Sequence, residues 1–217
     1  MSEEMIDKLQ KAIKADGVRN LPKRFYKSVD VVGEMPALSI ELDGRTIKTP
    51  LKANLAVPTA ALADAVAAEW DSQSEHIDPA TMPLTRLCNT AIDRIGDDPE
   101  SIIAELTDFA GSDLICYRAD TPQGLVERQN AAWDPLLAFA EAVIGARFVC
   151  VSGVMHHPQF VSALDAMKRY YASQSAFSLT AIHNITTLTG SSIIAAAVEQ
   201  GTLDGDQAWC AAVSYTH

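Results

Sequence analysis

The hydrophobic pattern of this chain changes its period once, and that change constrains the fold more than any other feature. Apolar and polar side chains alternate over residues 38–42, as in a half-buried strand. Asp43-Gly44 follows, then a second short run over 45–49, which predicts an antiparallel hairpin because a type I′ turn needs positive φ at both central residues. From Pro58 onward, apolar residues recur at helical spacing.

These patterns predict an α+β fold in two domains. A small N-terminal α/β domain with antiparallel strands is expected over residues 1–75, followed by an all-α C-terminal domain over residues 76–217. The pairs Asp98-Pro99 and Asp134-Pro135 predict helix starts, because proline suits the first helical position. The remaining expected elements are strands over 28–32 and 54–57 and helices over 2–16, 59–70, 82–95, 158–172, 178–188, 191–200 and 206–213.

Charge excludes several classes of partner. The chain carries 28 Asp and Glu against 17 Lys and Arg, for a net charge of −11. Such an acidic protein repels phosphate backbones and anionic lipid, so we expect no nucleic-acid partner. No apolar stretch is long enough to span a bilayer, and the first residues show neither a signal peptide nor a transit peptide. We therefore expect no membrane insertion and a cytoplasmic location. The sequence leaves the oligomeric state open and favours a monomer.

Signatures of catalysis and of metal binding are missing. The sequence contains no phosphate-binding glycine loop, no His-Glu-x-x-His and no Gly-x-Ser-x-Gly. Its four cysteines form no close pair along the chain, which argues against a zinc site and against a disulfide framework. The apolar neighbours of Cys150 are expected to raise its pKa and make it unreactive. We therefore expect no catalytic residue, no metal and no cofactor.

Three short segments combine polar and aromatic side chains in ways that a generic helix does not need. One ends a predicted helix, one forms a polar stripe opposite an apolar stripe, and one follows a predicted helix end. Each also has an ordinary interpretation as a solvated helix end, an exposed face with weak i, i+4 pairs, or simple packing. The candidate partner-binding residues in these segments are Trp70, Asp71, Gln73, Arg86, Asn89, Asp93, Asp113, Tyr117 and Arg118.

A family resemblance links these segments. In chain order, its motifs are Arg24-Phe25-Tyr26-Lys27, Leu42-Asp43-Gly44-Arg45, Glu69-Trp70-Asp71 with Gln73, the run 82–93, Asp113 with Cys116-Tyr117-Arg118, and Trp133-Asp134-Pro135-Leu136. Together they resemble the assembly chaperones of F-type ATP synthase that act on the alpha subunit of the catalytic head. The resemblance implies a small α/β domain followed by a helical domain. It also implies a bacterial member that is not an enzyme.

The same resemblance implies how the protein acts. A family member holds the unassembled alpha subunit by the surface that later meets the beta subunit, and the nine candidate residues would face that partner. The family also carries an acidic helix after the region of Ala208-Trp209, with a glutamate that is its best functional candidate. This sequence ends at His217 without that helix. The glutamate therefore has no counterpart here, and the chain is expected either to be cut short or to lack the element.

Two other functions are compatible with the residues. A small-molecule enzyme would use an acidic cleft between the two domains, with Asp71, Asp93 or Asp113 as general acid or base. A packing module without a client would explain the same helices without any binding site. The acidic surface itself suits either steering toward a basic partner or simple solubility.

Overall fold

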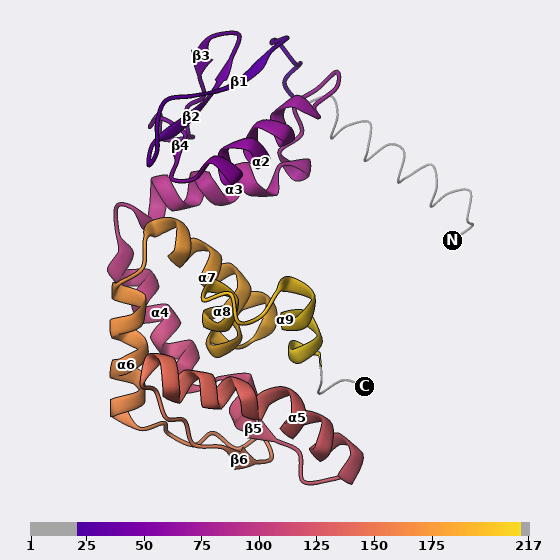
Figure 1. The fold of residues 1–217 in the computed structure, drawn as a ribbon, viewed down its shortest axis with the longest axis vertical. Helices are drawn as coiled ribbons and strands as arrows, with labels where there is room; N and C mark the ends of the chain where they lie inside the picture. The colour runs from indigo at the N-terminus through magenta and orange to yellow at the C-terminus, as the bar shows by residue number, and fades with distance from the viewer. Residues whose placement is uncertain (1–20, 214–217) are drawn as a thin grey trace, which may run out of the picture. The chain divides into compact units, whose positions relative to one another are not determined.

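The computed structural model describes residues 21–213, and its contacts divide the chain into two compact units after Asp93 (Figure 1). The first unit holds the strands of a small antiparallel sheet with two helices, and the second is mostly helical. The predicted α+β class is confirmed. The helix predicted over 2–16 lies outside the described residues. Among the described residues, no helix combines the length and the apolar character needed to cross a membrane.

Strand β2 (Leu38–Leu42) organises the sheet of the first unit. It pairs antiparallel with β1 (Val29–Val32), β3 (Arg45–Thr46) and β4 (Ala56–Val57). Every second side chain of β2 is buried, as the alternation predicts. The sheet therefore has one face directed to the core of this unit.

The predicted hairpin turn is present between β2 and β3. Asp43 and Gly44 have φ angles of 48° and 75°, which are the positive values that a type I′ turn requires. The Asp43 carboxylate also accepts hydrogen bonds from the backbone N–H groups of Lys27 and Ser28, at 3.0 and 2.9 Å. These bonds lower the pKa of Asp43 and tie the segment before β1 to the turn.

Helix α2 (Ala60–Asp71) packs against β1 and β2, with Ala63 and Val66 buried. Thr59 caps its start by accepting a hydrogen bond from the N–H of Leu62 at 3.3 Å, as predicted. Near its end, Glu69 lies beside helix α3 (Pro83–Thr90), which continues into a π-helical turn, Ala91–Ile95.

Glu69 explains why α3 belongs to the first unit. Its carboxylate accepts hydrogen bonds from the N–H groups of Leu84 and Thr85 at 2.6 and 2.8 Å, and from the Thr85 hydroxyl at 2.8 Å. A carboxylate at a helix N-terminus satisfies N–H groups that have no partner within the helix. The sequence places the domain boundary at residue 75, whereas the contacts divide the chain after Asp93.

The second unit is built around helix α8, in which all residues from Ser192 to Ala197 are buried. One apolar cluster lies between α4, α6 and α7, and another lies between α5, α8 and α9. Most of these helices begin within three residues of their predicted starts. Their bounds are α4 Pro99–Gly111, α5 Gln123–Phe139, α6 Val161–Ala172, α7 Ala176–Thr189, α8 Ser192–Glu199 and α9 Gly205–Ala212.

The helix start predicted at Asp134-Pro135 is wrong. Helix α5 begins at Gln123 and continues through Pro135. Trp133 is fully buried in the second unit, and its indole N–H donates to the carbonyl oxygen of Ala211 at 2.9 Å. Tertiary packing of this helix outweighs the roughly 3 kcal/mol that an internal proline costs.

A two-residue parallel strand pair, which the sequence did not indicate, lies beside the helices. Strand β5 (Tyr117–Arg118) pairs with β6 (Val151–Ser152), so that Tyr117 lies opposite Val151. Residues 114–116 form a 3₁₀ turn that leads directly into β5. The strand pair therefore connects the segment after α4 to the segment before α6.

Asp113 fixes that connection from within the core. One carboxylate oxygen accepts hydrogen bonds from the N–H groups of Ser192 and Ile193, at 2.8 and 3.1 Å, and from the Ser192 hydroxyl at 3.1 Å. The other oxygen accepts one from the N–H of Ile115 at 3.2 Å. Burial raises the pKa of Asp113, and these hydrogen bonds oppose that shift. A single side chain thus caps both α8 and the turn before β5.

We predict that Asp113→Ala destabilises the protein by about 3 kcal/mol or more, because it leaves several buried donors without an acceptor. The matched control is Asp98→Ala, which removes the exposed N-cap of α4 and should cost only about 1 kcal/mol. Urea unfolding of the three proteins measures the difference. Equal losses for the two variants would contradict the structural role of Asp113.

Candidate functional site

The first group of predicted residues is held together by Arg24. Its guanidinium donates to the carbonyl oxygens of Asp71, at 2.8 Å, and Gln73, and pairs with the Asp71 carboxylate at 3.2 Å. The same guanidinium lies 4.5 Å from the centre of the Tyr26 ring, and the Tyr26 hydroxyl donates to the carbonyl oxygen of Trp70 at 2.7 Å. The motifs around residues 24–27 and 69–73 therefore form one cluster at the end of α2.

Gln73 is buried within this cluster, and both the nitrogen and the oxygen of its side-chain amide form hydrogen bonds. Its nitrogen donates to the Glu69 carbonyl oxygen at 3.0 Å and to the Thr81 hydroxyl at 3.1 Å. Its oxygen accepts from the N–H of Asp78 at 2.8 Å. Gln73 therefore shapes the turn between α2 and α3. In contrast, the Asp71 carboxylate remains largely exposed.

The second group lies on the predicted stripe of α3 and the turn that follows it. Asp93 supports the segment after β3, because its carboxylate accepts hydrogen bonds from the Thr49 hydroxyl at 2.6 Å and the Leu51 N–H at 2.9 Å. Asn89 is half-buried, and its side-chain oxygen has no hydrogen-bond partner among the described residues. Arg86 is exposed. Within residues 21–213, no hydrogen bond or ion pair engages its guanidinium, so Arg86 is available to a partner.

In the third group, Arg118 is occupied within the second unit, like the buried Asp113. The Arg118 guanidinium donates to the Ile115 carbonyl oxygen at 2.8 Å and to Asn130 at 3.1 Å. It also pairs with Asp134 at 2.9 Å and lies 5.2 Å from the centre of the Trp133 ring. Arg118 therefore ties β5 to α5.

Tyr117 leads to a surface that the sequence analysis missed. Its hydroxyl lies 3.3 Å from Nδ1 of His156, in the segment between β6 and α6. We name residues 153–161 the apolar loop, because four of its side chains are strongly exposed within eight consecutive residues. These side chains and their exposed fractions are Val154 90%, Met155 81%, Phe160 55% and Val161 74%.

The base of the apolar loop is fixed although its apolar side chains are exposed. The Gln159 side chain is buried and forms two hydrogen bonds with the backbone of Val149, accepting from the N–H at 2.7 Å and donating to the carbonyl oxygen at 2.9 Å. The loop has no helical or alternating period, so pattern analysis gave no sign of it. Two adjacent apolar pairs, at 154–155 and 160–161, were the only signal in the sequence.

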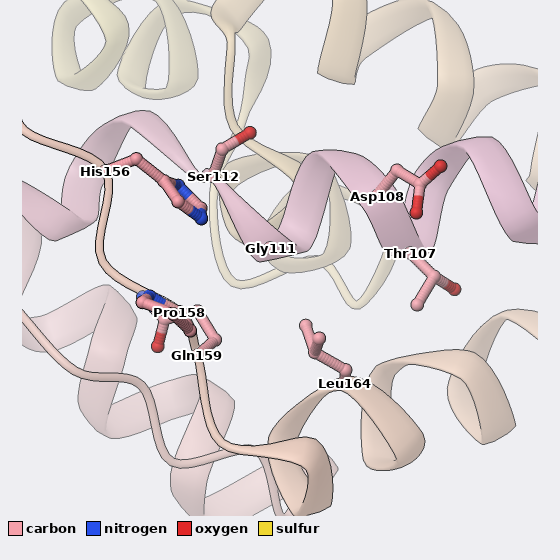
Figure 2. A pocket seen from close by; sticks show the side chains of 8 residues that line it. All are labelled: Thr107, Asp108, Gly111, Ser112, His156, Pro158, Gln159 and Leu164. Atoms are coloured by element: carbon pink, nitrogen blue, oxygen red, sulfur yellow. The ribbon is translucent and has the colours of Figure 1, made fainter.

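A cavity of about 280 Å³ adjoins the apolar loop. In Figure 2, loop residues lie along one side of this cavity and residues of α4 along another, with a leucine of α6 completing the lining. The lining residues are Thr107, Asp108, Gly111, Ser112, His156, Pro158, Gln159 and Leu164. The loop and cavity offer an exposed apolar surface beside a polar recess, which suits a protein partner.

The structure thus places six of the nine candidate residues in the first unit and three in the second. Gln73 and Asp113 are buried and support the fold, while Asp93 and Arg118 hold neighbouring segments. No group of three or more His, Cys, Asp or Glu side chains in residues 21–213 is arranged to hold a metal ion.

Comparison with known proteins identifies relatives of this chain. The family model described as ATP12 chaperone protein matches residues 23–141. The chain is 26% identical over 198 residues to the protein atp12, mitochondrial, of Schizosaccharomyces pombe, covering 86% of this chain and 68% of that protein.

Solved structures agree with this comparison. Atp12 from Paracoccus denitrificans is 39% identical, with a TM-score of 0.83 and coverage of 89% of this chain and 83% of that chain. The Atu1473 protein of Agrobacterium tumefaciens is 44% identical, with a TM-score of 0.82 and coverage of 88% of this chain and 72% of that chain. The resemblance carried by the sequence motifs is confirmed, and the chain belongs to the ATP12 chaperone family.

Proposed function

We propose that this protein binds the unassembled alpha subunit of F-type ATP synthase in the cytoplasm and promotes assembly of the catalytic head. Membership of the ATP12 chaperone family supports a role in assembly. The exposed apolar loop is the observation that supports binding of a protein partner. Clustered, strongly exposed apolar side chains mark surfaces that a partner covers. In this role the protein acts by covering the alpha subunit, and it makes or breaks no covalent bond in that partner.

The physical basis of this action is mass action. A ring subunit without its neighbours exposes a large interface and tends to aggregate. A chaperone that covers this interface lowers the concentration of the free, aggregating form. An interface of about 1,200–2,000 Å² is sufficient for specific binding, and its affinity must be low enough for the beta subunit to displace the chaperone.

Arg86 is a second proposed contact, in the first unit. A guanidinium pairs well with carboxylates in two-point geometry, and Arg86 has no such partner among the described residues. We infer that it meets an acidic side chain of the alpha subunit. Because it is the most available of the nine candidates, Arg86 replaces the buried Gln73 and Asp113 as the site to test.

The enzyme alternative depends on three carboxylates that have other roles. Asp113 is buried and accepts four hydrogen bonds from its own chain. Asp93 holds the segment that contains Thr49, and Asp71 pairs with Arg24. A general acid or base must instead reach a substrate. These contacts favour the chaperone over the enzyme.

We predict that the purified protein suppresses aggregation of isolated alpha subunit and co-elutes with it in gel filtration at concentrations in the tens of micromolar. Isolated beta subunit, tested in parallel, is the control for non-specific binding and should not co-elute. If no complex with alpha forms at these concentrations, the proposed function is wrong.

The double variant Val154→Asp/Met155→Asp is expected to weaken alpha-subunit binding at least tenfold, or about 1.4 kcal/mol, because two carboxylates would enter an apolar contact. Leu188→Asp is the matched control, since Leu188 is an exposed apolar residue of α7 outside the loop. Calorimetric titration measures both. Equal affinities of the loop variant and the control would contradict a role of the apolar loop in binding.

Arg86→Glu should weaken alpha-subunit binding about tenfold while leaving the free energy of unfolding within about 0.5 kcal/mol of the original, because its guanidinium has no partner within residues 21–213. Lys52→Glu makes the same charge reversal at another exposed position of the first unit and should bind normally. The loss for Arg86→Glu should shrink as salt is added. Unchanged binding at low salt would remove Arg86 from the proposed interface.

A further inference from the structure

The strand pair β5–β6 brings together two cysteines that are far apart in the sequence. Tyr117 lies opposite Val151 and Arg118 lies opposite Ser152, and Cys116 and Cys150 are the residues that directly precede these two paired strands. Neighbouring strands lie about 4.8 Å apart. That spacing falls within the Cα separations of about 4.4–6.8 Å that a disulfide bond tolerates.

The sulfur atoms are close as well as the backbone. The Cys116 side chain lies within hydrogen-bonding reach of the Cys150 sulfur. Neither cysteine is in a disulfide bond in this structure. The sequence showed no close pair because 33 residues separate the two cysteines along the chain. Helix α5 lies between them in the chain, and the segment that follows it, β6, pairs with β5.

The two thiols differ in their access to solvent. Cys116 is only 1% exposed, whereas Cys150 is exposed. A dissolved reagent can therefore reach Cys150 first, whereas the buried Cys116 thiol is shielded from it. This arrangement is that of an attacking thiol with a resolving thiol behind it.

The groups around Cys150 together favour its thiolate form. The pKa of Cys150 is lowered to about 6, and its hydrogen-bonding interaction with Cys116 is the largest cause. Partial burial opposes this shift, Arg118 acts in the same direction as Cys116, and Asp134 opposes it. The pKa of Cys116 is raised in turn. The expectation that Cys150 has a raised pKa is therefore wrong, because the sequence did not show Arg118 or Cys116 as its neighbours.

We propose that Cys116 and Cys150 form a redox-active dithiol that exchanges with low-molecular-weight disulfides of the glutathione class. This inference goes beyond the proposed chaperone function and does not depend on it. No oxidant other than the small disulfide is needed, and the reverse reaction uses the corresponding small thiol.

The exchange has two steps. The Cys150 thiolate attacks one sulfur of the small disulfide, forming a mixed disulfide and releasing one small thiolate. The Cys116 thiol then loses its proton, and its sulfur attacks the sulfur of Cys150 and releases the second small thiolate. Two protein thiols are oxidised to one disulfide, while one small disulfide is reduced to two thiols, with the protons passing to the released thiolates and solvent.

The product would covalently join the segments that precede β5 and β6. Cys150 lies three residues before Gly153, where the apolar loop starts, and Cys116 lies three residues after Asp113. The disulfide would thus fix the base of the loop to the capping site of α8. The other two cysteines do not belong to this pair: Cys88 is buried in α3 with a pKa raised to about 11, and Cys210 lies on α9.

The test uses the full chain in buffers of glutathione and glutathione disulfide. After alkylation of the remaining thiols, intact mass and peptide mapping should show a Cys116–Cys150 disulfide whose amount rises with the share of glutathione disulfide. Cys116→Ala should instead accumulate glutathione on Cys150, and Cys150→Ser should give neither product. Cys210→Ser, which alters the other exposed thiol, should behave like the original protein.

A second measurement separates the proposed dithiol from a merely exposed thiol. The rate of Cys150 alkylation by iodoacetamide should reach half its maximum near pH 6, and this midpoint should rise in Cys116→Ala because the hydrogen-bonding interaction with Cys116 is lost. Circular dichroism checks that each variant is folded. Absence of the disulfide in oxidising buffer, or equal glutathione accumulation in folded Cys116→Ala and in the original protein, would overturn the proposal.

Discussion

The buried carboxylate of Asp113 is the interaction on which the second unit depends. It accepts hydrogen bonds from the turn before β5, two residues further along the chain, and from the start of α8, 79 residues further along. Helix α8 is the most buried helix of this unit, and a buried helix start without acceptors would be costly. One buried side chain therefore fixes the position of β5 against the core, and β5 in turn positions its partner β6.

That chain of contacts ends at the surface proposed for partner binding. Strand β6 leads into the apolar loop, the paired hydrogen bonds of Gln159 to Val149 hold the base of the loop, and Tyr117 approaches His156. The exposed apolar side chains of the loop therefore extend from a backbone that hydrogen bonds hold in place. A rigid display lowers the conformational entropy that is lost on binding, which is useful when the interface must be both specific and reversible. The same region contains the Cys116–Cys150 pair, so its chemistry and its binding surface are adjacent.

Local signals predicted most of the fold but little of the candidate site. Some features depend only on residues that are neighbours in the sequence, and the structure confirms them. They are the Asp43-Gly44 turn, the Thr59 cap and the helix start at Asp98-Pro99. Pro135 was misread because burial of its neighbour Trp133 outweighs the local preference of proline. The pairing of β5 with β6 and the cap that Asp113 provides for α8 depend on residues distant in sequence, which no periodicity reveals. The apolar loop was missed because its side chains follow no secondary-structure pattern.

Hydrogen–deuterium exchange of the protein, alone and with an excess of alpha subunit, tests most directly whether the protein works by covering a partner surface. We expect exchange to slow in the backbone amides of the apolar loop, while the amides of α8, which are already buried, change little. A complex that forms without any protection of residues 153–161 would contradict the account, because binding would then involve some other surface.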